Sequence, residues 1–287
     1  MGERLKLAWM KLPLAVRAII AGFAVLLAGI VPWSALASAN LQLGSTLPWA
    51  VFVELAYLAG LWWFLSGKGW PKSTSSVRRQ SLRANAVGPR LLGWSIVAGS
   101  LFVSTLIALR VVGWLLVSVP PTTLEEFALL EGHPAWTAVP LLLMGAVVTG
   151  IMEEAAFRGY MQVPLEQRYG PEIAIGVVAV IFALAHFPSP LALPGFILGA
   201  VGWGLLAYLT DSILPGAGLH AVADAAVWIW VWGDRASVAS LLTTSALQGD
   251  ASLPFVVAAG LTVALGIAAT LAFWKLARVR QAERLKR

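Results

Sequence analysis

Residues 141–163 read LLLMGAVVTGIMEEAAFRGYMQV and begin as an apolar run of the kind that spans a membrane. Within this run the chain places Glu153, Glu154 and Arg158, although it has only 14 acidic residues in all. Ionisable side chains inside a span are unfavourable and mark a functional site by default. The stretch therefore predicts a membrane helix that also carries a candidate site.

The composition of the whole chain is that of a membrane protein. Of its 287 residues, 59% are hydrophobic and only 12% are charged, and the mean hydropathy is +0.81. Soluble domains have roughly 25% charged residues. The chain has no cysteine, which excludes a thiol nucleophile, a disulfide framework and thiolate metal ligands. Its net charge of +6 is concentrated at segment ends, which is typical of contact with anionic lipid rather than with nucleic acid.

The apolar segments predict the fold class. A transmembrane helix needs about 20 mostly apolar residues. Segments that fit this length, or nearly so, lie at 18–38, 48–66, 91–119, 138–158, 172–187, 191–210, 214–232 and 254–274. We therefore predict an all-α, polytopic membrane protein with about eight transmembrane helices.

Basic residues predict the orientation of these helices. The N-terminal residues, the polar linker 67–90 and the tail 275–287 are strongly basic, whereas the loop before the fourth span is acidic. Cytoplasmic loops carry an excess of Lys and Arg, and eight spans put all three basic stretches on one side. Both termini are thus expected in the cytoplasm, and the Ala-, Gly- and Trp-rich composition favours a bacterial inner membrane.

The first charged motif is EEAAFR, residues 153–158. Glu154 and Arg158 are four residues apart, so they share a helix face and can pair. Glu153 is rotated by about 100° from Glu154, since an α-helix has 3.6 residues per turn. We expect Glu154 and Arg158 to form an ion pair that braces the helix, and Glu153 to face a different neighbour.

Two further motifs carry histidines at the same spacing. FALAH places Phe182 beneath His186, and HAVAD places His220 and Asp224 on one helix face. Both histidines lie within or at the end of apolar segments. They are therefore the imidazoles that a site containing Glu153 would use.

The turn between the first two motifs predicts that they meet. The sequence Tyr-Gly-Pro at 169–171 has the residues that end one helix and begin the next. Glu153 and His186 are almost equally far from this turn, so in an antiparallel hairpin they lie at the same height. His220 is closer to its own turn, and its height agrees only if the helices protrude, tilt or break.

These residue types indicate hydrolysis of an amide bond. A carboxylate beside an imidazole can activate a water molecule as a general base. A second polar pair, His220 and Asp224, can stabilise a developing oxyanion. The other common hydrolase patterns, H-E-x-x-H and G-x-S-x-G, do not occur in the chain.

The three motifs, in this order, resemble those of the CAAX-protease and bacteriocin-processing family, also called the Abi or CPBP family. Its patterns are EExxxR, FxxxH and HxxxN or HxxxD, and the likeness extends over residues 153–224. The resemblance, to type II CAAX prenyl proteases, implies an intramembrane glutamate-type endopeptidase whose helices enclose a catalytic cavity. It implies a membrane-associated protein or peptide substrate, the lipid bilayer as surroundings, no nucleic acid and no cofactor.

The resemblance also implies a division of the chain and a set of site residues. Residues 1–137 would hold N-terminal spans, 138–232 the catalytic core, and 233–287 the last span with its basic tail. The site comprises a water-activating pair, an oxyanion pair and a supporting pair: Glu153 with His186, His220 with Asp224, and Glu154 with Arg158.

Asp224 departs from the pattern of family members described mechanistically, which have Asn there. An ionised Asp would repel an oxyanion. Either Asp224 is protonated, or it accepts a hydrogen bond from His220 and holds that imidazole as the donor. We favour the second interpretation because the two residues are four apart on a helix.

Two other functions stay open at this point. In a zinc peptidase, Glu154 or Glu153 would bind the metal together with His186 and His220, leaving a position for water. A non-enzymatic immunity protein or a proton-coupled transporter would use the same buried charges differently.

Arg110 and Glu54 are further charges inside predicted spans and belong to none of the motifs. Three interpretations stay open for them: a mutual ion pair, snorkelling to the interface, or the lining of an access path.

Overall fold

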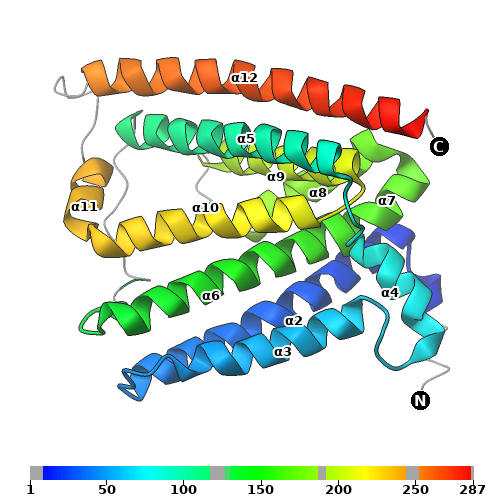
Figure 1. The fold of residues 1–287 in the computed structure, drawn as a ribbon, viewed down its shortest axis with the longest axis horizontal. Coiled ribbons are helices and arrows are strands. Elements are labelled where there is room, and N and C mark those ends of the chain that lie inside the picture. The colour runs from blue at the N-terminus through cyan, green and yellow to red at the C-terminus, as the bar shows by residue number, and fades with distance from the viewer. Residues whose placement is uncertain (1–8, 117–126, 128, 187–191, 244–251, 286–287) are drawn as a thin grey trace.

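The chain forms a bundle of helices (Figure 1). The computed structural model describes residues 9–116, 127, 129–186, 192–243 and 252–285. Six helices in this part are long and apolar enough to cross a membrane, and two shorter apolar helices accompany them, Trp49–Leu65 and Pro171–Ala185. The described residues contain no strand. The all-α, polytopic fold predicted from the sequence is therefore confirmed.

The helices follow the predicted segments closely, and short helices are added in the connections. In chain order they are α2 (Leu14–Gln42), α3 (Trp49–Leu65), η1 (Lys72–Thr74), α4 (Ser75–Leu82), α5 (Pro89–Leu116), α6 (Ala135–Glu153), η3 (Glu154–Met161), α7 (Gln162–Tyr169), α8 (Pro171–Ala185), α9 (Leu193–Thr210), α10 (Leu214–Gly233), α11 (Arg235–Thr243) and α12 (Ser252–Arg284). The predicted segment ends at 117–119, 187 and 191 lie outside the described residues.

The fourth span is longer than predicted. It was expected to end at residue 158, but α6, η3 and α7 form one continuous helical run from Ala135 to Tyr169. The middle part, η3, is π-helical, and the N–H of Gln162 reaches back to the oxygen of Phe157. The helix continues because backbone hydrogen bonds do not stop where the apolar residues stop. π-Helical turns occur frequently at functional sites.

A proline in α2 leaves a backbone oxygen free to form a hydrogen bond with α3. Pro32 has no N–H, so the carbonyl of Ala28, four residues earlier, loses its helical donor. The hydroxyl of Tyr57 on α3 donates to this oxygen at 2.6 Å. Inside a bilayer each backbone polar group must find a partner within the protein. The bond therefore satisfies the proline break and holds α3 against α2.

Small residues bring the helices that carry the motifs close together. A Cβ added at Gly150 of α6 would lie 2.7 Å from the oxygen of Ala217 and 2.8 Å from the nitrogen of Ala221, both on α10. Gly99 of α5 similarly leaves room for Leu219 of α10. Membrane helices associate through such small residues, because lipid gives little hydrophobic drive.

The segment 67–90, expected as a polar linker, contains α4 and is tied to the ends of the site helices. Arg83 forms ion pairs with Glu166 of α7 and, at 3.3 Å, with Asp211 in the turn between α9 and α10. The N–H of Ile213 donates to the oxygen of Arg83 at 3.0 Å. These contacts hold the end of α7 level with the α9–α10 turn.

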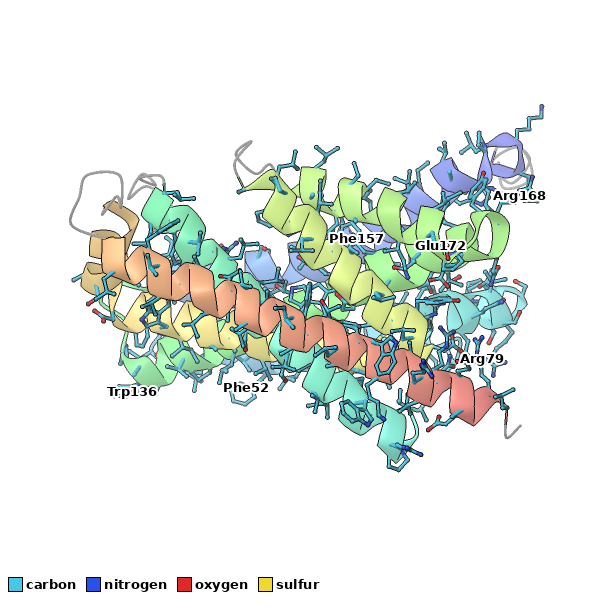
Figure 2. All side chains as sticks on the ribbon, turned by 90° about the horizontal axis from the view of Figure 1, so that it is seen from above. Phe52, Arg79, Trp136, Phe157, Arg168 and Glu172 are labelled. Carbon is cyan, nitrogen blue, oxygen red and sulfur yellow. The ribbon has the colours of Figure 1, made fainter. Side chains whose placement is uncertain are left out.

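The basic parts of the chain lie at one end of the bundle. The start of α2, α4, α7 and the end of α12 share this end (Figure 1). Arg79, Arg168 and Glu172 lie there as well, whereas Trp136 lies at the opposite end (Figure 2). The bundle thus has the arrangement that the basic stretches predicted, with those parts of the chain on a common side.

Candidate active site

The three motifs meet between α6, η3, α8 and α10. Nε2 of His186 lies 3.8 Å from Oε1 of Glu153, and Nε2 of His220 lies 3.8 Å from Oε2 of the same residue. The predicted proximity of Glu153 and His186 is therefore confirmed. Both distances are too long for a direct hydrogen bond, and a single water molecule can bridge groups at such separations.

The two adjacent glutamates have different surroundings, as their rotation about the helix predicted. Glu154 is fully buried, and its Oε1 lies 3.3 Å from Nη1 of Arg158 and 3.3 Å from Nδ1 of His220. Arg158 is also fully buried and donates to the oxygen of Ala200 at 3.4 Å. The predicted ion pair is present. The contact of Glu154 with His220 was not predicted.

His186 is held in one orientation at the end of α8. Its Nδ1 lies 2.7 Å from the backbone oxygen of Phe182. A carbonyl oxygen can only accept, so Nδ1 carries the hydrogen and Nε2 is directed at Glu153. The rings of Phe182 and Phe196 pack against the imidazole, with centroids 4.4 and 4.9 Å away. The predicted contact with Phe182 is confirmed.

His220 is oriented by Glu154 rather than by Asp224. Its Nδ1 faces Glu154 at 3.3 Å, while Oδ2 of Asp224 lies 3.7 Å from Nε2, beyond hydrogen-bonding distance. The hydrogen bond that we expected from His220 to Asp224 is therefore not formed. The indole of Trp203 stacks on the imidazole with centroids 5.3 Å apart and planes 9° apart. Together Glu154 and Trp203 fix the plane of the ring.

Two aromatic residues of α9 belong to this cluster, and the sequence reasoning missed both. Trp203 and Phe196 lie in the predicted span 191–210, but in none of the three motifs. One signal was available for Trp203. Membrane tryptophans concentrate at the interfaces, whereas Trp203 lies in the middle of an apolar segment.

The cluster contains carboxylate oxygens without a protein partner. Among the described residues, Oε2 of Glu153, Oε2 of Glu154 and Oδ2 of Asp224 are buried and accept no hydrogen bond. The exposed fraction of the side chain rises from 0% at Glu154 to 12% at Glu153, 23% at Asp224 and 30% at His186. Buried acceptors call for a polar partner. Such a group can approach from the side of Asp224 and His186.

The same side chains are poorly arranged as metal ligands. Zinc requires three or four ligand atoms about 2.0–2.3 Å from one point. Oε1 of Glu154 instead faces both Arg158 and Nδ1 of His220, and Nε2 of His186 faces Glu153. Within the described part of the chain, no group of three His, Asp or Glu side chains could hold a metal ion. The set Glu154, His186 and His220 thus does not fit zinc as it stands.

Two hollows in the described structure lie away from the motifs. One of about 360 Å³ lies along α12 and is lined by residues between Thr262 and Leu271. The other, of about 210 Å³, lies among α2, α7 and α8 and is lined by Ala15 and Ile173. Neither is lined by a motif residue. Within the cluster itself, His186 and Asp224 are the more exposed side chains.

The π-helical segment η3 helps to bring Glu153 and His220 to similar heights along their helices. More residues separate Glu153 from Glu166 on the one helix than separate Asp211 from His220 on the other. Nevertheless Arg83 connects Glu166 to Asp211, and Glu153 lies beside His220 in the site. Eight of the residues between Glu153 and Glu166 are π-helical. A π-helix has more residues per turn than an α-helix and rises less per residue. The π-helical segment therefore reduces the difference in height between Glu153 and His220.

The fold and the cluster define a class of protein. This is an integral membrane protein with several apolar helices, in which an acid from one helix meets two imidazoles from others.

Residues 134–226 match the family model described as "Type II CAAX prenyl endopeptidase Rce1-like". This part of the chain is thus similar to that family, and the resemblance inferred from the three motifs is confirmed. The matched segment covers about a third of the chain and includes all three motifs. Searches of the curated proteins and of the solved structures returned no significant match. The family match supports a membrane protease, a hydrolase that meets a membrane-associated peptide within a lipid environment.

Proposed function

We propose that the protein is a glutamate-type intramembrane endopeptidase in which Glu153 and His186 activate a water molecule. The observation that carries this proposal is the position of Glu153, whose two oxygens each lie 3.8 Å from an imidazole Nε2. A water between Glu153 and His186 would donate one hydrogen to each. No other described acid has imidazoles on both of its oxygens.

The proposed reaction is balanced by proton transfers through Glu153. Glu153 takes a proton from the water while the oxygen of that water bonds to the substrate carbonyl carbon. The carbonyl oxygen becomes an oxyanion, which the Nε2–H of a doubly protonated His220 stabilises. Glu154 supports this state because it accepts from Nδ1 of His220. The C–N bond then breaks, and the proton on Glu153 passes to the leaving amine nitrogen.

The surroundings of the site support a substrate that arrives from the membrane. His186 and Asp224, the more exposed members, lie on helices that are mostly apolar. An extended peptide within or next to the bilayer can approach on that side. We further propose that the enzyme resides in a bacterial inner membrane with both termini in the cytoplasm, on the basis of the shared basic end of the bundle.

A comparison of peptides released in cells tests the activity. Cells producing the wild-type protein, Glu153→Gln or Glu172→Gln are compared by mass spectrometry of peptides and of new protein termini. Glu172 is exposed at the start of α8 and serves as the matched control. Products should appear with the wild type and with Glu172→Gln, and disappear with Glu153→Gln. Equal products from all three proteins would refute the hydrolase and leave a transporter or an immunity protein.

Metal removal separates this mechanism from the zinc alternative. The purified protein should keep its full hydrolytic activity after exhaustive treatment with a strong chelator, because the proposed base is a carboxylate. Elemental analysis of the same sample establishes that the metal is gone. Activity that is lost with the metal and returns with added zinc would support the zinc peptidase instead.

Gly150 provides a test of how the site is assembled. Gly150→Ala adds a Cβ that would lie 2.7 Å from a backbone oxygen of α10, so α6 and α10 must move apart. Because Glu153 and Glu154 follow one turn later, their distances to His220 should increase. We expect hydrolysis to fall by at least roughly tenfold, since small displacements of reacting groups have effects of this size.

The control for Gly150 is Gly176 on α8, where an added Cβ would meet nothing within 4 Å. Gly176→Ala should keep its activity and melt at the same or a slightly higher temperature, because alanine favours the helix. If both variants keep wild-type activity, close approach of α6 to α10 is not needed for the site.

A further inference from the structure

Arg110 is a charged residue of α5 that lies beside the site and belongs to none of the motifs. Its Cζ is 5.9 Å from the centroid of the Phe196 ring, and this ring packs on His186 at 4.9 Å. The sequence left open a pair between Arg110 and Glu54. Both oxygens of Glu54 are buried and accept no hydrogen bond among the described residues, so that pair is not formed. Arg110 is instead one aromatic ring away from the imidazole.

The site acid on which the charge of Arg110 acts is Asp224. The two side chains attract each other electrostatically, and Arg110 is the arginine outside the motifs that acts on Asp224. Their helices run side by side in the same direction, with Gly99 of α5 against Leu219 of α10 (Figure 1). Helical side chains lean towards the N-terminus of their helix. Arg110 therefore reaches back from its position on α5 towards the level of Asp224.

The charges around His220 show why an arginine in addition to Arg158 would stabilise the site. Oxygens of Glu153, Glu154 and Asp224 all lie within 3.8 Å of its ring nitrogens. Arg158 pairs with Glu154 on the fully buried side. In a medium of low dielectric constant, like charges repel strongly, and a reaction that forms an oxyanion adds one more negative charge. Even with Arg158 and the doubly protonated His220 as cations, the three acids leave this group with a net negative charge before the oxyanion forms.

We propose that Arg110 is a positioning residue that balances the charge of Asp224, so that the Nε2–H of His220 remains available to the oxyanion. This inference rests on the proposed function. Oδ2 of Asp224 lies 3.7 Å from Nε2 of His220 without a hydrogen bond, and the charge of Arg110 acts on the same carboxylate. A neutral Asn at position 224 would need no such partner. Arg110 thus accounts for an acid at a position where the family pattern also allows Asn.

A double-mutant cycle tests the inference in the full-length protein. Arg110→Gln, Asp224→Asn and the double variant are compared with the wild type in liposomes, with a peptide identified as a substrate of the wild type. Arg110→Gln alone should lower kcat by about tenfold with little change in KM, a coupling typical of residues that interact. In the Asp224→Asn background the same change should lower kcat less than about twofold. Arg110→Lys should restore most of the rate, because it keeps the charge.

Arg278→Gln is the matched control, since Arg278 also lies over an aromatic ring, that of Trp274, but on α12. It should leave kcat unchanged. An equal loss from Arg110→Gln in both backgrounds, or a change in KM alone, would overturn the inference.

The proposed function can fail separately from this inference. If the wild type shows no cleavage that depends on Glu153, the proposed function fails, and the melting temperatures of the same four proteins still test the charge balance. Arg110→Gln should then lower the melting temperature more in the wild-type background than in the Asp224→Asn background. Equal shifts would overturn the inference without any assay of activity.

Discussion

Glu153→Gln is expected to lower kcat for peptide-bond hydrolysis by about 10²- to 10⁴-fold, the range that general base catalysis contributes. Glutamine has nearly the same shape, and its amide can still contact a water between positions 153 and 186. It cannot take a proton from that water. The loss should therefore appear in kcat, while KM for the peptide stays close to that of the wild type.

Stability measurements decide whether such a loss is chemical. Glu153 accepts no hydrogen bond through Oε2 and has no arginine within ion-pair distance among the described residues. Glu153→Gln should therefore fold normally and melt at or above the temperature of the wild type. Glu172→Gln, an exposed change of the same kind, should leave both kcat and the melting temperature unaltered. A Glu153→Gln protein that retains more than about a tenth of the wild-type rate would exclude this residue as the base.

Arg158→Gln is expected to destabilise the folded protein by about 3–5 kcal/mol, which is typical when one partner of a buried ion pair is removed. Glu154 and Arg158 are both fully buried, and their carboxylate and guanidinium meet at 3.3 Å. Arg158 also packs over the ring of Phe182 at 4.5 Å. The substitution leaves Glu154 in the core without its guanidinium partner, with only the imidazole of His220 beside it. Thermal unfolding in detergent measures the effect.

Two further variants distinguish this explanation from a simple loss of packing. In the double variant Glu154→Gln/Arg158→Gln both charges of the buried pair are removed together, so it should recover most of the lost stability. Arg235→Gln removes one partner of a partly exposed ion pair with Glu131 and should change stability by at most about 1 kcal/mol. A double variant as unstable as Arg158→Gln would mean that packing of the guanidinium, not charge, stabilises this part of the bundle.

The family match and the geometry support each other at different levels. The match covers residues 134–226 and supports membrane protease activity for a segment that contains all three motifs. The distances around Glu153 suggest which acid would activate water. The roles of individual residues are therefore the part that the variants above must decide.

Local spacing in the sequence was sufficient for a large part of this description. Helical periodicity and length predicted the apolar helices, because a span must bury its backbone in hydrocarbon. The four-residue spacing predicted the pairing of Glu154 with Arg158 and of Phe182 with His186, since residues four apart share a helix face. The Tyr-Gly-Pro turn at 169–171 predicted that Glu153 and His186 meet.

Other features could not be read from spacing, because they depend on which helices pack together. The partner of His220 was predicted four residues away, at Asp224, but the closer acid is Glu154 on a different helix. The π-helical turn of η3 shifts the heights of the helices by an amount that no local pattern reveals. Trp203 and Arg110 reach the site from α9 and α5.

What the sequence alone determined is therefore the membrane class, the spans and the face on which each charged residue lies. Local geometry is enough for these features, because neighbouring residues on a helix have fixed relative positions. Only the tertiary structure decided which acid holds which imidazole and which aromatic rings and cations surround them. Those contacts depend on close approach at small residues such as Gly150 and Gly99, which brings together helices that are far apart in the chain.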